Sequence, residues 1–403
     1  MTRRIKFFVA STSTCLVFVL LFGAMRGKSA SPEDTYRHLA VYTEVLSRIK
    51  SDYVEEPDMK SVTLGALNGL LESIDPYASY LNADQYKQWL QSKDQHKADV
   101  GLVLSKKFGY VGIVDSIPGS PAAKAGLTTN DIIESIDNVA TRDMPLAFAE
   151  ILLQGDPGTT VEMSVLRTIR SDPQKIVLTR AAIDVPPDSA RLITDQGDAI
   201  GLVSTVSVDA TRVRDIAQKI ADLDRQGAKR FILDLRHSSE GSPEDGVALA
   251  NLFMDKGLIG YSVGQKSPRQ DFQAVASKQV TKKPLVVLTN RATSGGAEVA
   301  AAALLESKRA EVVGERTYGD AAIRKAVNLD DGSAVILSVA KYYGPDGKAI
   351  QDTAVMPSTP QLEAEVQAEV DIDATDAPPP PPKNGPDLIL QKGEEVVKKV
   401  ALN

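Results

Sequence analysis

The stretch that decides the fold runs from residue 284 to residue 320 and reads PLVVLTNRATSGGAEVAAAALLESKRAEVVGERTYGD. Its first part, 285–288, is a short β-branched apolar run, which predicts a buried strand. A turn with the paired glycines Gly295 and Gly296 follows, and the alanine-rich stretch 297–305 has helical character. Because a strand that leads through a glycine turn into a helix aims backbone N–H groups at one point, this segment can hold an oxyanion or a carboxylate.

Strands continue to alternate with helices across the region that begins at residue 200. We predict strands at 200–203 and 231–235, and helices at 214–223 and 244–253. This alternation indicates βαβ units and a largely parallel sheet.

The region before it, from residue 98 to about 178, has short apolar runs separated by glycine turns. Such a pattern predicts short strands with one helix, and their order is typical of a PDZ domain. The expected elements are strands at 100–104, 111–114, 132–136 and 161–166, and a helix at 146–153.

Helical spacing dominates the chain from residue 32 to about 95. One predicted helix has its apolar residues on a single face. These residues are Leu39, Tyr42, Val45, Leu46 and Ile49.

The first 30 residues have the pattern of an export signal or a membrane anchor. Arg3, Arg4 and Lys6 precede the 19-residue uncharged stretch 7–25. A small-x-small cleavage site is poorly formed, because Lys28 lies two positions before its best candidate end, and this favours retention as an anchor. We therefore expect a protein that is membrane-anchored or exported and faces the periplasm or the cell exterior.

The composition excludes several classes of function. The chain has 403 residues, which suits two or three domains, and its net charge of −7 argues against nucleic acid as a partner. The single cysteine, Cys15, excludes an internal disulfide and a cysteine-rich metal site. We expect no metal and no cofactor. Near the end, residues 378–382 are a proline run after an acidic segment, and 388–402 predicts a terminal helix.

The deciding stretch resembles the catalytic core of the carboxyl-terminal processing peptidases, also called tail-specific proteases, a family of serine-type peptidases. The family's pattern reads roughly N-x-x-S-A-S-A-S-E, then a helix, then V-V-G-E-x-T-F-G-K-G. Other segments carry the same resemblance. Residues 36–54, 64–67 and 74–81 resemble the family's N-terminal helical region, and residues 119–127 with 131–133 resemble its PDZ domain. Residues 231–236 resemble the strand before the family's N-x-P-G-G turn, and residues 340–350 resemble the segment after its active site.

The resemblance places the family's catalytic positions on unexpected residues. Aligned on Asn290 and Glu298, the nucleophilic serine falls on Gly295 and the lysine general base falls on Asp320. The family's acidic residue late in the helix falls on Glu306. Both members of the Ser-Lys dyad are therefore replaced, although a turn glycine and a solvated aspartate are also ordinary loop residues.

Ser294 is the residue that would rescue catalysis. A shift of one residue near a helix start rotates the side chain by roughly 100°, away from the expected N–H donors. Ser294 would also need an amine, and the nearest in sequence are Lys308 and Lys325, which do not match the family position. A turn or helix-capping role for Ser294 is the alternative.

The turn that in the family contributes to the oxyanion hole also departs from the pattern. Where the family has P-G-G, this chain has Ser239-Glu240-Gly241. Glu240 restricts the backbone and puts a negative charge near the site where an anion would form. We assign Glu240, Gly241 and Gly296 to the region of the oxyanion turn. His237, just before it, is most simply a polar loop residue.

One binding loop keeps the family's features. Val100, Gly101, Leu102 and Val103 resemble the PDZ loop whose backbone N–H groups capture a peptide C-terminus while the peptide adds as a strand. The resemblance implies that the partners are extracytoplasmic proteins or peptides, bound through free C-termini. A structural turn is the alternative.

The sequence thus predicts an α/β and α+β multidomain protein with an N-terminal helical region, a PDZ domain and a mixed βαβ-type peptidase core of the processing-peptidase and crotonase-like kind. The expected function is that of a catalytically inactive relative that binds protein C-termini as an adaptor or regulator. The alternative is an active serine-type endopeptidase that cleaves near C-termini with a non-standard nucleophile such as Ser294. The predicted boundaries are 1–30 for the signal or anchor, 31–95 for the helical region, 96–185 for the PDZ domain, 186–358 for the core and 359–403 for the tail.

Overall fold

A computed structural model describes residues 32–94, 98–167, 172–195, 197–351, 353–363 and 386–401. The chain divides into two compact units, Met1–Ala66 and Leu67–Asn403. The predicted signal or anchor at 1–30 lies outside the described residues. Among the residues that are described, no helix combines the length and the apolar composition needed to span a membrane.

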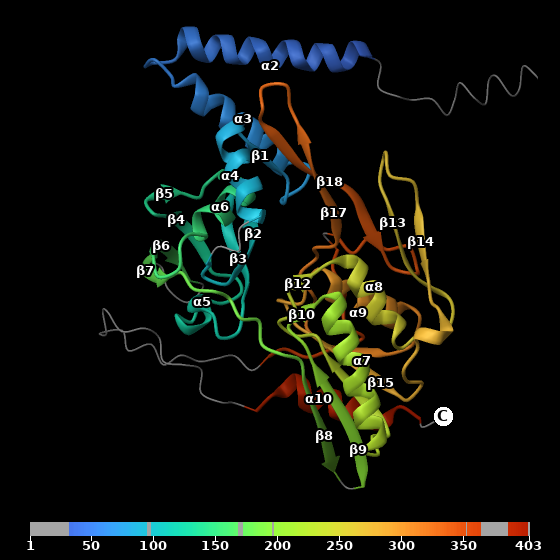
Figure 1. The fold of residues 1–403 in the computed structure, drawn as a ribbon. Coiled ribbons are helices and arrows are strands. Elements are labelled where there is room, and N and C mark those ends of the chain that lie inside the picture. Colours follow the sequence, from blue (N-terminus) through green and yellow to red (C-terminus); the bar gives the residue numbers. More distant parts are fainter. Residues whose placement is uncertain are drawn as a thin grey trace, which may run out of the picture. The chain divides into compact units, whose positions relative to one another are not determined.

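The described residues of the first unit are largely helical, as the sequence predicts. Helix α2 (Pro32–Asp52) is followed by α3 (Met59–Glu72), which continues into the second unit (Figure 1). The apolar face predicted for the first helix is largely open, because Leu39 is 57% exposed and Val45 is 51% exposed.

The PDZ domain is an antiparallel sheet in the order β2-β3-β4-β6-β7, with β5 paired to β4. The helix predicted at 146–153 forms as α6 and packs its apolar residues against this sheet. All four predicted strands are present, and β7 is an additional edge strand. The elements are β2 (Leu102–Lys107), β3 (Tyr110–Ser116), α5 (Pro121–Lys124), β4 (Ile132–Ile136), β5 (Val139–Ala140), α6 (Leu146–Leu153), β6 (Thr160–Leu166) and β7 (Gln174–Thr179).

The peptidase-like core is built on a six-stranded sheet in the order β19-β16-β15-β11-β9-β8. Every neighbouring pair is parallel except β8 with β9, which confirms the prediction of a largely parallel sheet. The strands are β8 (Ser189–Asp195), β9 (Asp198–Ser204), β11 (Arg230–Asp234), β15 (Leu285–Thr289), β16 (Glu311–Gly314) and β19 (Thr359–Pro360).

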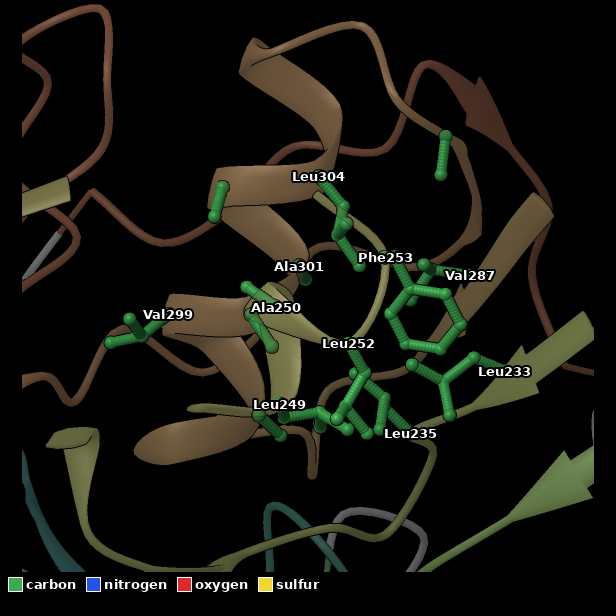
Figure 2. Packing of buried hydrophobic residues seen from close by; sticks show 14 of the residues in the cluster. Leu233, Leu235, Leu249, Ala250, Leu252, Phe253, Val287, Val299, Ala301 and Leu304 are labelled. Carbon is green, nitrogen blue, oxygen red and sulfur yellow. The ribbon is translucent and has the colours of Figure 1, made fainter. Parts of the chain in front are cut away.

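Helices cover both faces of this sheet. Along β15, Leu285 and Val287 belong to the apolar cluster shared with α7 (Ala210–Arg225), α8 (Pro243–Asn251) and α9 (Gly296–Glu306). Val286 and Leu288 belong instead to the cluster that includes Ile389 of α10 (Leu388–Lys399). A strand buried on both faces needs an unbroken apolar run, which is what its sequence shows. Phe253, after α8, lies in the first cluster with Leu233 and Val287 (Figure 2).

A second sheet in the core contains strands that the sequence did not predict. Its order is β1-β18-β13-β14, with β17 paired to β18. Residues 79–81, which the resemblance placed in the N-terminal helical region, form β1 and pair antiparallel with residues 334–336 of β18. The remaining elements are β1 (Ser79–Leu81), α4 (Ala83–Asp94), β10 (Ser207–Val208), β12 (Glu240–Gly241), β13 (Leu258–Val263), β14 (Gln270–Gln273), the 3₁₀ helix η1 (Ala276–Lys278), β17 (Ala322–Asn328) and β18 (Ala334–Tyr343).

Candidate site at the turn before helix α9

The turn between β15 and α9 is sharp, and Gly295 is its apex. Gly295 caps α9 with φ +61° and ψ −123°, a conformation that residues with side chains rarely adopt. A strained strand-to-helix turn of this kind carries the nucleophile in other hydrolase folds. A Cβ atom at this position would lie 3.2 Å from the carbonyl oxygen of Gly241 and 4.0 Å from that of Asp320.

The two predicted dyad positions lie side by side. The Gly295 N–H donates to the Asp320 carbonyl oxygen at 3.0 Å, which agrees with the alignment of both positions to one site. The Asp320 carboxylate forms an ion pair with Arg324, whose Nη1 lies 3.4 Å from Oδ2. The guanidinium of Arg324 in turn lies over the ring of Tyr77, 4.1 Å from its centre. Arg324 therefore neutralises the charge at the position of the general base.

Glu298, used in the sequence only to align the motif, holds the turn together. Its carboxylate is fully buried and accepts N–H groups from Gly295 at 3.2 Å, Gly319 at 2.7 Å and Asp320 at 2.8 Å, as well as the hydroxyl of Thr317. Burial raises the pKa of the Glu298 carboxyl to about 7, although these donors favour its charged form. A sequence signal for this role exists, since a glutamate three residues after a helix cap is the spacing of a capping box.

Ser294 points into the protein and binds a backbone carbonyl. It is 3% exposed, its N–H donates to the carbonyl of Ser238 at 3.0 Å, and its hydroxyl donates to the carbonyl of Ser239 at 3.3 Å. Lys308 follows the far end of α9. Lys325 is next to Arg324 on β17, so its side chain points to the opposite face of the strand. The structure does not bring either lysine to Ser294.

Glu306 lies at the other end of α9. The helix spans residues 296 to 306, so Glu306 is roughly 15 Å from Gly295 at the usual rise per residue. Its carboxylate accepts the N–H of Asp346 at 3.0 Å, and burial raises its pKa to about 7. Glu306 therefore braces a distant loop and does not meet Gly295 or Asp320.

The turn at Glu240 and Gly241 presents an acceptor to the site. Gly241 has φ +112°, and a Cβ there would overlap the carbonyl oxygen of Val208 at 1.8 Å, so the position requires glycine. The carbonyl oxygen of Gly241 is the atom nearest to the position that a Cβ atom at residue 295 would take. An oxyanion hole needs N–H donors in this place, and a carbonyl would repel the anion. Gly296, the first residue of α9, packs closely on the carbonyl of Ser242.

His237 forms part of a chain of polar contacts and is not paired with a nucleophile. Its Nδ1 lies 3.2 Å from the Asp115 carboxylate of β3, and its Nε2 lies 3.1 Å from the amide nitrogen of Asn290. An amide nitrogen can only donate, so in the neutral imidazole Nε2 accepts and Nδ1 carries the proton toward Asp115. The Asn290 amide also donates to Glu363 at 2.9 Å. This chain joins the PDZ strand β3 to the core.

The predicted peptide-binding loop, 100–103, leads into β2. In the described residues β2 pairs only with β3, so no strand occupies its other edge. Two donors of the loop already have an acceptor, since the N–H groups of Val100 and Gly101 donate to the Asp99 carboxylate at 2.6 Å and 2.8 Å. The sequence contains a signal for this contact, because an aspartate is a known local acceptor for the backbone N–H groups of the residues that follow it.

This fold and this turn define a class of protein, one with a PDZ domain next to an α/β core of the peptidase type. The chain belongs to the peptidase family S41. The model of that family matches residues 199–360, and the model of the PDZ domain matches residues 112–167.

Known proteins support this placement. The chain is 31% identical over 374 residues to the carboxy-terminal processing protease CtpA of Bacillus subtilis, covering 91% of this chain and 78% of that protein. It is 30% identical over 364 residues to the carboxyl-terminal-processing protease of Picosynechococcus sp., covering 86% and 87%. Among solved structures it is similar to the photosystem II D1 C-terminal processing protease, with a TM-score of 0.67, 25% identity, and coverage of 80% of this chain and 92% of that one. The family and fold expected from the sequence are confirmed.

Proposed function

We propose that this protein binds the C-terminal segments of other proteins without cutting them, as an adaptor or regulator outside the cytoplasm. The observation that carries the proposal is the pair of residues at the catalytic turn. Gly295 offers no side-chain nucleophile, and the Asp320 carboxylate is paired with Arg324. Losing the nucleophile of a serine protease costs about 10⁶ in turnover, and a base without a nucleophile has nothing to activate.

Two further features of the site support a protein that does not hydrolyse peptides. The Gly241 carbonyl, and not a donor, faces the Gly295 position. The Ser294 hydroxyl is engaged with the Ser239 carbonyl. A backbone carbonyl cannot take the proton of an attacking hydroxyl as an amine or an imidazole can.

The PDZ domain supports the binding half of the proposal. The edge of β2 that pairs with no described strand can accept an extended peptide as an added strand. The partners we propose are proteins or peptides with free, apolar C-termini. The basic residues before the apolar stretch 7–25 support a location at the membrane, facing outward. Cell fractionation tests this location, and a soluble form that starts near Ser31 would contradict the anchor.

The direct test is hydrolysis of peptides and of unfolded protein by the full chain, beside an active relative at equal concentration. We expect no turnover above that of a buffer control. If cleavage is detected, the Ser294→Ala variant decides its origin. Activity that disappears with this substitution would replace the proposal by the alternative of an active endopeptidase that uses Ser294.

A further inference from the structure

Asp99 stands immediately before the peptide-binding loop, and its main chain is fixed there. The Asp99 N–H donates to the Ala181 carbonyl at 2.9 Å, and the Ala181 N–H donates to the Asp99 carbonyl at 2.9 Å. This pairing holds the residue beside the loop. Its Oδ1 atom then accepts the N–H groups of both Val100 and Gly101.

The contact places a carboxylate where the proposed ligand would place one. A PDZ loop captures a peptide C-terminus by donating consecutive backbone N–H groups to its carboxylate. In this chain two N–H groups of that loop are used by an internal carboxylate, at 2.6 Å and 2.8 Å. An N–H group has one hydrogen to donate, so an incoming carboxylate and Asp99 compete for the same donors.

We propose that Asp99 is the specificity-determining residue of the loop, an internal competitor that must leave Val100 and Gly101 before the terminal carboxylate of a peptide can bind these donors. The inference rests on the proposed function, because it concerns the same groove. It predicts that the unaltered protein gains little from a peptide's terminal carboxylate. Binding then depends mainly on strand addition along β2 and on apolar side chains.

The charges around Asp99 strengthen the competition. Burial, followed by the charge of Asp99, raises the pKa of the Glu240 carboxyl. Burial also raises the pKa of the Asp99 carboxyl, against the lowering effect of its two backbone N–H donors and of the charge of Arg180. The guanidinium of Arg180 already donates to the carbonyls of Leu152 and Leu153, both at 2.9 Å. An incoming carboxylate therefore meets two negative groups and a cation with other partners, which disfavours its entry.

A purely structural role for Asp99, as the cap of a local turn, makes a different prediction. In that case its removal would loosen the loop and weaken every peptide alike. Competition instead changes the ratio of affinities between a peptide with a free C-terminus and the same peptide with a C-terminal amide. This ratio is the quantity to measure.

The first experiment titrates the full chain with short peptides that end in Val, Leu or Ala, each in free and amidated form. For the unaltered protein we expect the two forms to bind within about threefold of each other. Asp99→Ala frees both donors and should tighten binding of the free form by about tenfold or more, the effect of hydrogen bonds to a charged group, while the amidated form is unchanged. Asp99→Asn keeps an acceptor oxygen without the charge, so it should fall between the two.

A tenfold preference of the unaltered protein for free C-termini would overturn the inference, because the donors would then be available. An unchanged ratio in both variants, with peptides still bound, would also overturn it. Thermal unfolding of each variant shows whether it is folded, and Asp99→Asn preserves the turn if Asp99→Ala does not.

The second experiment needs no peptide, and so separates this inference from the proposed function. Acetate is added to ¹⁵N-labelled protein, and the amide resonances of Val100 and Gly101 are followed. We expect saturable shifts in Asp99→Ala and none in the unaltered protein. Equal responses in both, or none in Asp99→Ala, would overturn the inference. If acetate acts as expected but no peptide binds any variant, the inference stands and the proposed peptide binding is wrong.

Discussion

At the scale of single residues, the contacts of Glu298 explain how the turn keeps its shape with a glycine at position 295. Three of its four donors are backbone N–H groups, those of Gly295, Gly319 and Asp320. None of these bonds depends on which side chain stands at position 295 or 320. The backbone geometry of the turn is therefore independent of the side chains at positions 295 and 320. These side chains can be replaced while the turn keeps its shape.

Restoring the two dyad side chains should give only weak hydrolysis. In Gly295→Ser with Asp320→Lys, the new Cβ lies 3.2 Å from the Gly241 carbonyl, so that neighbour must move, and Arg324 loses its partner beside a new cation. Missing one oxyanion donor costs about 10²–10³ in turnover, so we expect peptide hydrolysis at least that far below an active relative. Adding Glu240→Gly should raise it. Full activity of the double variant alone would show that Glu240 and Gly241 do no harm.

Glu298 should make the stability of the protein decrease as pH rises, which is opposite to the effect of a carboxylate whose pKa is lowered by folding. Because the folded protein raises its pKa from 4.5 to about 7, the fold favours the protonated form. The free energy of unfolding should therefore fall as pH rises between these values, by up to about 1.4 kcal/mol per pH unit, and level off above them. Glu298→Gln is the matched control, since it keeps the size of the side chain and an acceptor oxygen but cannot titrate and so lacks this slope. Urea unfolding from pH 4.5 to 8 measures both, and equal slopes would contradict the assignment to Glu298.

At the scale of elements, burial decides which parts of the fold the sequence reveals. The run 285–288 is apolar at every position because helices cover both sides of β15, and the sequence predicts it as a buried strand. The strand β17 has no fully buried residue, so no alternation marks it. The three residues of β1 become a strand only by pairing with β18, more than two hundred residues away. Pairing between such distant segments leaves no local trace in either of them.

The same limit applies to the candidate site. The relation between Gly295 and Asp320 follows from a motif, and the structure agrees with it. The partner of Asp320 does not follow from the motif, because Arg324 reaches it only through the path of the chain into β17. The sequence shows which residue types stand at the candidate site, whereas the partner of Asp320 follows only from the three-dimensional structure.

The contact between His237 and β3 should be tighter at lower pH. Burial lowers the pKa of the His237 imidazole, but the hydrogen bond and charge of Asp115, with Glu363, outweigh burial and raise it. A raised histidine pKa gives stability that is complete below the unfolded value of 6.5 and is lost as pH rises through the folded value. Hydrogen exchange of β3 and of residues 236–242 should accordingly show less protection, beyond the intrinsic rate change, as pH rises.

Asp115→Asn should remove most of that dependence, because it keeps the side-chain shape and removes the charge. Glu363→Gln is the matched control with a smaller effect, since its carboxylate lies 3.9 Å from Nε2 while Asp115 lies 3.2 Å from Nδ1. A dependence that survives in Asp115→Asn would contradict the role given to this pair.

At the scale of the whole molecule, the last described helix closes the core sheet. Arg236, just after β11, pairs at 2.7 Å with both Asp234 and Asp387, the residue that caps α10. Arg230, at the start of the same strand, donates to the carbonyl of Val397 at 3.0 Å near the other end of the helix. One strand therefore fixes both ends of α10 through arginines. Between them, Ile389 and Val397 are fully buried against the sheet.

Removing residues 386–403 should expose that face and destabilise the core. Ile389→Ala alone should lower the free energy of unfolding by about 2–5 kcal/mol, the usual cost of such a cavity, while Gln391→Ala on the exposed side of α10 should change it by less than about 0.5 kcal/mol. Urea unfolding of the two point variants measures this difference. The truncated chain should in addition bind a hydrophobic dye through the uncovered residues of β9, β11 and β15. A truncated chain as stable as the full one would mean that α10 only rests on a sheet that is already closed, and the two arginine contacts would then have no part in holding the core.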